Sequence, residues 1–239
     1  NGKLYILSWL KKKSLYLTRK DAICDNTNTI WFLEGKEWTN YFWLTNLNDD
    51  GILHPIGFGP PPENICTLTV GPENEIWVGE SGSSLAEFKN NTWKLQPYEY
   101  SPLRGIECLT TNESETVWVG GGDIKLTKFQ WDTYKSYYEN LGGFWTSDTI
   151  HSLSFDKNNI LWMGFGPDNK GVIKYDGATW SQYTTADGLF DDRVHAIAVD
   201  AVNTKWFGTS AGVSRFDGAN WTSFSTVGNG DSIGEVTTL

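Results

Sequence analysis

Five residues with polar or reactive side chains recur along the chain at intervals of 41 to 46 residues. They supply an amine, a thiol, a carboxylate and two imidazoles: Lys20, Cys66, Glu107, His151 and His195. If the fold gathers them at one level, they could bind a polar ligand. Thiol, carboxylate and imidazole groups also bind transition metals. A metal site needs three such groups close together and correctly aimed, so we expect polar side chains bonded to neighbours or water, with no metal and no cofactor.

Motifs typical of hydrolases, nucleotide-binding proteins and metalloproteases are absent from the sequence. It contains no G-x-S-x-G, P-loop, H-E-x-x-H or C-x-x-C pattern. The chain has three histidines, at positions 54, 151 and 195. A general base at the recurring level could therefore come only from His151, His195 or Glu107. We expect recognition without turnover and assign no catalytic residue.

An aromatic repeat fixes the spacing of the five recurring residues. Each lies five residues before an Asp or its stand-in, and that anchor lies six residues before a Trp. The tryptophans are Trp31, Trp77, Trp118, Trp162 and Trp206, and the second aromatic anchors that follow them are Trp38, Trp93, Tyr134, Trp180 and Trp221. Because the repeat covers nearly all of the chain, we expect a single domain spanning residues 1–239.

Each repeat divides into four short strands, best seen at residues 194–200, 205–208, 213–216 and 221–224. An Asp- and Asn-rich turn follows the first strand, and Asp217–Gly218 is a hairpin signal between the third and fourth. One four-stranded antiparallel sheet every ~42 residues is the blade of a β-propeller. The sequence thus predicts an all-β propeller. Each Trp of the second strand should be largely buried between neighbouring blades, and the Gly that follows it should let backbones approach.

The first strands of a propeller converge around its central channel. They start on the face that carries the turns between second and third strands and the connections between blades. Lys20, Glu107, His151 and His195 are therefore expected to encircle this mouth. We expect Trp145 and Arg193 to reach in from the connections, where an aromatic ring could stack on a sugar and polar groups could bind its hydroxyls. Trp145 could equally fold back over its own blade.

The two ends of the chain look like complementary parts of one repeat. Residues 1–5 resemble residues 158–162, the turn and start of a second strand, and residues 235–239 resemble a first strand. We therefore expect residues 235–239 to pair with residues 3–8 and to complete a sixth, composite blade. Five or seven blades are the alternatives, and so is a chain cut from a longer propeller.

Charge and cysteine content narrow the possible partners. The net charge of −10 argues against nucleic acid and anionic membrane surfaces, and no apolar run is long enough to span a membrane. The expected partner is a small molecule or an oligosaccharide, and the oligomeric state stays open. Cys24, Cys66 and Cys108 fall on first strands at heights and facings that keep their Cβ atoms beyond the ~4 Å a disulfide needs. We expect all three to be reduced.

The repeat also resembles a known family. V-x-x-I-x-x-D, W-F-G-T and F-D-G, present as residues 194–200, 206–209 and 216–218, are similar to two-component regulator propeller repeats. Residues 71–80, GPENEIWVGE, resemble the streptogramin-lyase type of propeller repeat. The resemblance implies a bacterial, periplasmic or extracellular propeller with a non-enzymatic sensing role, often linked to polysaccharide use. A lectin-like propeller with several sugar sites, or a lyase with its base among His151, His195 and Glu107, are the alternatives.

Overall fold

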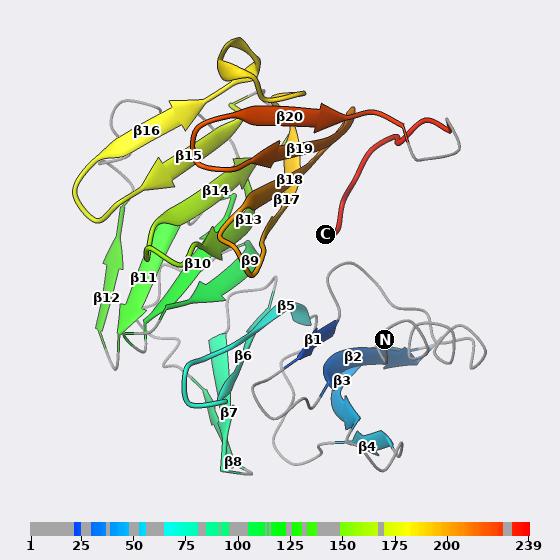
Figure 1. Ribbon diagram of the computed structural model, residues 1–239. Coiled ribbons are helices and arrows are strands. Elements are labelled where there is room, and N and C mark those ends of the chain that lie inside the picture. Colours follow the sequence, from blue (N-terminus) through cyan, green and yellow to red (C-terminus); the bar gives the residue numbers. More distant parts are fainter. Residues whose placement is uncertain are drawn as a thin grey trace.

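The computed structural model describes residues 22–24, 30–36, 39–47, 53–55, 65–80, 85–90, 92–95, 105–112, 114, 116–122, 126–130, 133–137, 149–166, 170–226 and 231–239; before Cys66, and at Glu80, it describes the backbone alone. Within these ranges the chain forms five four-stranded antiparallel sheets, each with its strands in chain order (Figure 1). We number these sheets blades 1 to 5.

The strand bounds follow the predicted repeat closely. Blade 1 has β1 (Ala22–Cys24), β2 (Ile30–Lys36), β3 (Thr39–Leu47) and β4 (Leu53–Pro55). Blade 2 has β5 (Ile65–Val70), β6 (Ile76–Glu80), β7 (Leu85–Lys89) and β8 (Thr92–Leu95). Blade 3 has β9 (Ile106–Thr111), β10 (Val117–Gly121), β11 (Leu126–Gln130) and β12 (Thr133–Ser136). Blade 4 has β13 (Ile150–Phe155), β14 (Leu161–Phe165), β15 (Val172–Tyr175) and β16 (Trp180–Tyr183). Blade 5 has β17 (Val194–Val199), β18 (Lys205–Thr209), β19 (Gly212–Phe216) and β20 (Trp221–Phe224).

The first strands β1, β5, β9, β13 and β17 contact one another in sequence, so the blades are arranged around them. This arrangement is a β-propeller, as predicted. A 3-10 turn at Thr185–Asp187 lies between blades 4 and 5. Within the described ranges no helix is long and apolar enough to cross a membrane.

The six-residue spacing between Asp and Trp has a clear physical cause in blades 4 and 5. Asp156 Oδ1 accepts hydrogen bonds from two backbone N–H groups of its turn, and Oδ2 accepts one from Trp162 Nε1 at 3.1 Å. Asp200 does the same in its own turn and accepts from Trp206 Nε1 at 3.2 Å. The carboxylate thus closes the turn and fixes the Trp at once. The predicted tolerance of positive φ in these turns is confirmed at Asn159 and Asn203.

In blade 2 a carboxylate also closes the turn and binds the Trp, but it comes from a different position in the sequence. Gly71 stands at the Asp position, and a Cβ built on it would lie 1.7 Å from Glu75 Oε1. The Glu75 side chain therefore fills the space that an Asp side chain would occupy. It accepts hydrogen bonds from the Glu73 backbone N–H at 2.9 Å and from Trp77 Nε1 at 3.4 Å.

Blade 3 has an amide in place of this carboxylate at the anchor position. Asn112 stands at the anchor position and accepts the backbone N–H of Ser114 at 3.1 Å. Among the described residues, the buried Trp118 Nε1 has no hydrogen-bond partner. The other polar atom of the Asn112 side chain, Nδ2, is a donor and cannot accept a hydrogen bond from an indole N–H.

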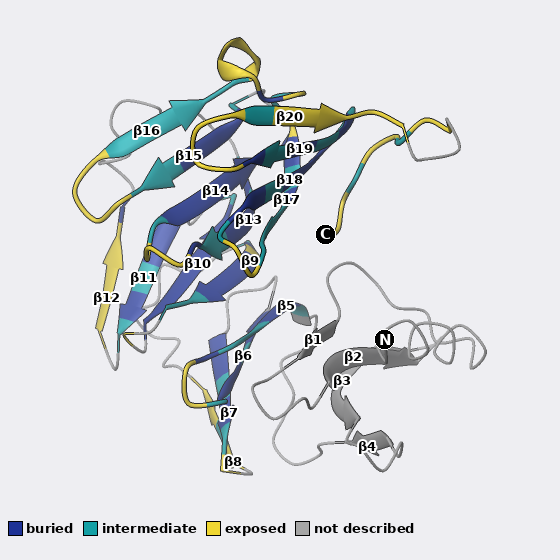
Figure 2. Cartoon of the chain, viewed as in Figure 1, coloured by how far each residue is buried: buried dark blue, intermediate teal, exposed yellow. Residues whose placement is uncertain are grey.

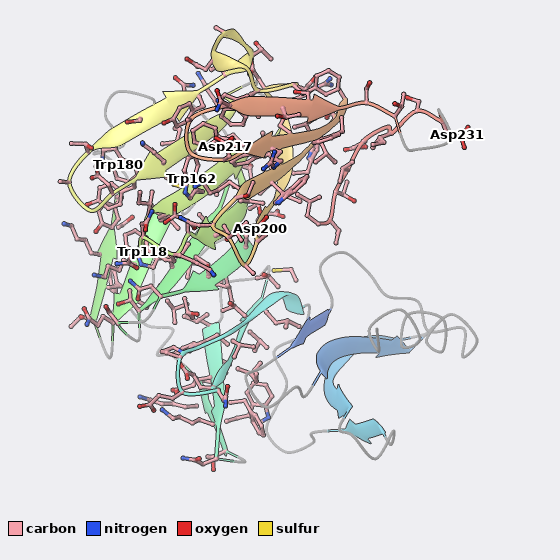
Figure 3. The ribbon with its side chains drawn as sticks, viewed as in Figure 1. Trp118, Trp162, Trp180, Asp200, Asp217 and Asp231 are labelled. Atoms are coloured by element: carbon pink, nitrogen blue, oxygen red, sulfur yellow. The ribbon has the colours of Figure 1, made fainter. Side chains whose placement is uncertain are left out.

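The second-strand tryptophans lie where the sequence predicts, on β2, β6, β10, β14 and β18. Trp118 and Trp162 are 5 % and 2 % exposed, because the following blade covers them (Figure 3). Trp118 contacts Phe155 and Tyr175 of blade 4, and Trp162 contacts Phe207 and Phe216 of blade 5.

The extent of burial differs among the second-strand tryptophans whose side chains are described. Trp77 and Trp206 are only half-buried. Trp206 packs on Phe224 and Arg215 of its own blade, so its burial depends on what covers blade 5. The side chain of Trp31 lies outside the described residues. Figure 2 shows how burial falls from the inside of a blade to its outer edge: the second strands β10 and β14 are buried, whereas outer strands such as β12 are exposed.

A buried ion pair also joins blades 4 and 5. Lys205 Nζ lies 3.6 Å from Asp156 Oδ2, and both side chains are almost fully buried. The same ammonium group lies over the rings of Trp162 and Phe216. Asp156 therefore organises its own turn and binds the next blade.

The glycine two residues after the second-strand Trp of blades 2 to 5 sets the distance to the next segment, as predicted. A Cβ on Gly120 would lie 2.9 Å from Ile150 Cγ2, and a Cβ on Gly164 would lie 2.8 Å from Val194 Cγ1. Both neighbours open the first strand of the following blade. At Gly208 the equivalent neighbour is Val236, whose backbone N–H also donates to Thr209 O at 2.9 Å.

The C-terminal segment, residues 231–239, therefore lies where the first strand of a further blade would begin (Figure 1). The predicted pairing with residues 3–8 falls outside the described residues. The count of six blades and the single domain over residues 1–239 stay predictions.

Candidate functional site: a mouth of bulged first strands

The recurring residues occupy a β-bulge in four successive blades. In blade 5, Val194 pairs with Thr209 and Ala196 pairs with Gly208, so His195 has no residue opposite it. The register shifts at the same position in β5, β9 and β13, at Cys66, Glu107 and His151. A bulge bends the strand and re-aims the extra side chain. Glu107 is exposed and the other three are half-buried, whereas the residue after each bulge is buried.

In blades 4 and 5 the bulged residues face the turns between second and third strands, as predicted. His195 Nε2 lies 2.8 Å from Ser210 Oγ in the turn of blade 5. In blade 4 the equivalent position is Gly166, and a Cβ there would lie 2.3 Å from His151 Nε2. The two imidazoles adjoin, with ring centroids 6.1 Å apart at 71°. We call this surface, formed by the bulged residues and the adjacent turns, the mouth.

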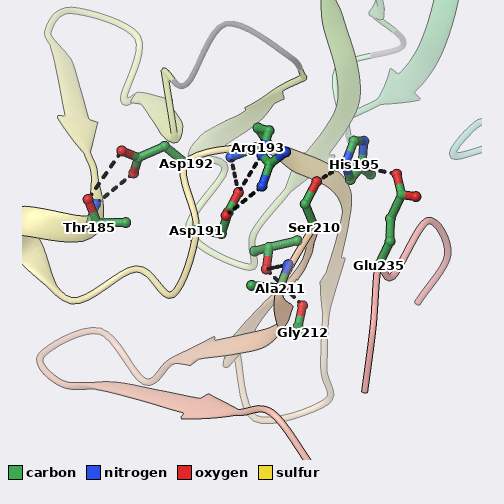
Figure 4. A network of polar contacts seen from close by, with 10 residues as sticks. Thr185, Asp191, Asp192, Arg193, His195, Ser210, Ala211, Gly212 and Glu235 are labelled. Atoms are coloured by element: carbon green, nitrogen blue, oxygen red, sulfur yellow. Dashed lines mark hydrogen bonds and ion pairs between the residues drawn. The ribbon is translucent and has the colours of Figure 1, made fainter. Parts of the chain in front are cut away.

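The C-terminal segment adds a carboxylate to the mouth. Glu235 Oε1 lies 3.2 Å from His195 Nε2 (Figure 4). Because a carboxylate only accepts hydrogen bonds, the proton lies on Nε2 when this contact forms. Ser210, His195 and Glu235 do not form a catalytic triad, since the hydroxyl and the carboxylate contact the same ring nitrogen and not opposite ones.

The connection between blades 4 and 5 presents Arg193. Its Nε and Nη2 donate to the two oxygens of Asp191, each at 3.1 Å, and its backbone N–H donates to Asp191 Oδ1 at 2.9 Å. This bidentate contact lowers the pKa of the Asp191 carboxyl, mainly through the side-chain hydrogen bond from Arg193. Arg193 O accepts the backbone N–H of Ser210 at 3.1 Å, which ties the connection to the turn beside His195.

The same connection is held at several points along its length. Asp192 accepts hydrogen bonds from the backbone N–H and the hydroxyl of Thr185 at 2.7 and 3.2 Å (Figure 4). Leu189 is buried, and the backbone N–H of Phe190 donates to Ser214 Oγ at 2.9 Å. Arg193 is therefore presented from a fixed loop, as a preorganised site requires.

The structure brings only some of the predicted site residues together. His151 and His195 adjoin, and Arg193 lies beside His195 through Ser210. Glu107 occupies the bulge of blade 3. Lys20 and Trp145 lie outside the described residues, so their expected positions at the mouth stay predictions.

Three residues of the mouth were missed in the sequence: Asp191, Ser210 and Glu235. Ser210 could have been found by aligning the turns, because it lies four residues after Trp206 just as Gly166 follows Trp162. Asp191 and Glu235 carry no repeat signal.

The cysteines serve the seams between blades. The Cys66 thiol donates to Ile106 O at 3.0 Å, and the Cys108 thiol donates to Ile150 O at 3.3 Å. Neither thiol is in a disulfide, which agrees with the predicted reduced state for these two. The side chain of Cys24 lies outside the described residues. No group of three His, Cys, Asp or Glu side chains in the described ranges is placed to hold a metal ion.

Comparison with known proteins supports the fold. No protein-family model matches the sequence, and no curated protein matches it. Among solved structures, virginiamycin B lyase from Staphylococcus aureus is similar with a TM-score of 0.64 at 12 % identity, over 85 % of this chain and 68 % of that one. A gluconolactonase from Xanthomonas campestris is similar with a TM-score of 0.66 at 12 % identity, over 94 % of this chain and 80 % of that one.

A third similar structure is an extracellular domain assigned to a hybrid two component system from B. thetaiotaomicron. Its TM-score is 0.55 at 18 % identity, over 85 % of this chain and 28 % of that one. The chain thus spans less than a third of that domain's length. At such identities the likeness extends to the fold alone, which is that of a β-propeller.

Proposed function

We propose that the protein is a non-enzymatic recognition propeller that binds a small polar ligand, an oligosaccharide, at the mouth. The observation that carries this proposal is the bulge shared by four successive blades. Each bulge leaves one polar or reactive side chain half-buried or exposed directly before a buried residue. Bulges of this kind are frequent beside binding sites. The resulting row of Cys66, Glu107, His151 and His195 offers hydrogen-bond donors and acceptors at equal height.

A sensing role is consistent with the similar solved structures, which include extracellular domains of one- and two-component regulators. We propose a periplasmic or extracellular location on the same ground and from the repeat resemblance. A lectin-like propeller with several sugar sites is a variant of this proposal. It requires ligand contacts in more than one blade, with Trp145 and Lys20 contributing from outside the described residues.

A lyase is the second candidate, favoured by the likeness to virginiamycin B lyase. Its general base would have to be His151, His195 or Glu107. At His195 the base could not be Nε2, because that nitrogen carries the proton directed to Glu235 and also contacts Ser210; only Nδ1 would be left to take up a proton.

Binding to an array of oligosaccharides, followed by titration of the best ligand, tests the proposal. His151→Ala and His195→Ala should each weaken binding by roughly two- to tenfold, the size of one lost hydrogen bond between neutral groups. Thermal stability should stay nearly unchanged, because both side chains lie at a half-exposed bulge. Lys94→Ala, on the exposed outer strand β8, is the control and should not affect binding.

Unchanged binding together with a large loss of stability would show that the histidines only fill space between strands. Conversion of the bound oligosaccharide to a product would support the lyase.

A further inference from the structure

The guanidinium and the imidazole on the blade 5 side of the mouth are already paired with carboxylates. We infer that Asp191 and Glu235 determine selectivity: by occupying Arg193 and His195, they set the mouth to accept uncharged, hydroxyl-bearing ligands and to reject anions. This inference rests on the proposed function and specifies its ligand class.

Arg193 is not a free anion-binding group. Two of its N–H donors are directed to both oxygens of Asp191 in a fork, and the backbone N–H of Arg193 holds the same carboxylate in place. The guanidinium is 47 % exposed and the Asp191 side chain only 20 %. The carboxylate is therefore held beneath the guanidinium, and the remaining N–H donors of Arg193 are open to a ligand.

His195 is paired in the same way. Its Nε2 contacts Ser210 Oγ and Glu235 Oε1, so an approaching acceptor would have to displace one of them. Glu235 also lies near enough to Arg193 to raise the pKa of the guanidinium, after the larger contribution of Asp191. The two pairs therefore form one patch of mixed charge (Figure 4).

This patch discriminates between ligands according to which of its existing contacts a ligand would have to break. An anion that is attracted by Arg193 is also repelled by Asp191 and Glu235. The net charge of −10 on the whole chain adds to this repulsion. A cation meets the exposed guanidinium. A hydroxyl group both donates and accepts, so it can bind to an N–H of Arg193 or to an oxygen of Glu235 while both pairs stay intact. Unlike a free arginine, the paired one gives no advantage to a carboxylate.

The test compares three hexasaccharides, of glucose, galacturonate and glucosamine, by calorimetric titration of the full chain. The wild-type protein should bind the neutral hexasaccharide best, with an affinity nearly independent of salt. Asp191→Asn should release Arg193 and raise the affinity for hexagalacturonate relative to the neutral ligand by about tenfold, the size of one hydrogen bond to a charged group.

Glu73→Gln is the matched control. It makes the same change in net charge, but it lies in the turn of blade 2 at the end of the strands away from the bulges, and it should leave the preference unchanged. Thermal melting of each variant confirms that it is folded.

A wild-type protein that prefers hexagalacturonate or glucosamine hexasaccharide, or an Asp191→Asn protein with unaltered preference, would overturn the inference and leave the proposed function standing. If none of the three binds to either protein while the array also shows no ligand, both are wrong.

Discussion

Asn112→Asp should stabilise the protein, because it restores to blade 3 the carboxylate that blades 4 and 5 use. In those blades an Asp oxygen accepts from the Trp indole N–H at 3.1 and 3.2 Å. In blade 3 the equivalent Trp118 Nε1 is buried and has no partner among the described residues. The substitution exchanges the Nδ2 donor of the amide for an acceptor oxygen of the same size.

The size of the effect follows from what is gained. A hydrogen bond to a charged group contributes roughly 1.5–3 kcal/mol, and relieving a buried unpaired donor is part of that gain. The added negative charge on a chain of −10 opposes it only weakly at physiological salt. We therefore expect an increase of about 1–2 kcal/mol in the free energy of unfolding, which for a chain of this length raises Tm by about 2–8 °C.

Urea unfolding, followed by both tryptophan fluorescence and far-UV circular dichroism, measures this change. A double-mutant cycle isolates its cause: in a Trp118→Phe background, which has no indole N–H, Asn112→Asp should lose most of its benefit. Asp200→Asn makes the opposite exchange in blade 5 and should destabilise. If Asn112→Asp is neutral while Asp200→Asn destabilises, or if the gain persists without the indole, the reasoning about the missing acceptor is wrong.

Three further predictions follow from the fold. Gly164→Ala should lower the free energy of unfolding by about 1–3 kcal/mol, because its Cβ would lie 2.8 Å from Val194 Cγ1 of the next blade. Chemical denaturation measures this change. Gly234→Ala is the control, because nothing lies within 4 Å of its Cβ, and its free energy of unfolding should change little. The pKa of Asp176 is lowered to about 2, first by the hydrogen bond from the Thr179 hydroxyl. Its contribution to stability is therefore complete above pH 3.8 and disappears as the pH falls through about 2. The acid-unfolding curve of Asp176→Asn should lack this loss of stability, and a curve identical to that of the wild type would refute the prediction. If residues 3–8 pair with residues 235–239, deleting residues 1–19 should accelerate hydrogen exchange at the Val236 amide, and equal exchange in both proteins would show that the termini do not share a sheet.

The sequence predicted the features that repeat and missed those that do not. Strands, turns and the positions of the tryptophans follow from local periodicity, which each blade shows independently. Equal spacing from the anchor also placed Glu107, His151 and His195 at one level. The bulge itself could not be recognised in the sequence, because blades 2 to 5 all carry the extra residue and the length of the repeat is therefore unchanged.

How far each Trp is buried, and which side chains contact it, depends on the neighbouring blade. The local sequence pattern could therefore not predict these features. Trp162 and Trp206 occupy equivalent positions, yet only Trp162 is covered by a described blade. Glu75 acts for the absent Asp in blade 2 from a position four residues later, which a position-by-position alignment cannot show. Asp191 lies at the mouth because of the course of the connection between blades 4 and 5, and Glu235 because of the course of the C-terminal segment. The repeat pattern does not predict either course.

The single carboxylate of Asp156 has a consequence for how the molecule unfolds. It closes the turn of blade 4, orients Trp162 and receives the ammonium group of Lys205 from blade 5. Undocking blade 5 would leave a buried carboxylate short of its counter-ion, and opening the turn would release the Trp that blade 5 packs against. Neither event can occur alone at low free energy, so blades 4 and 5 should open as one cooperative unit larger than the sequence repeat.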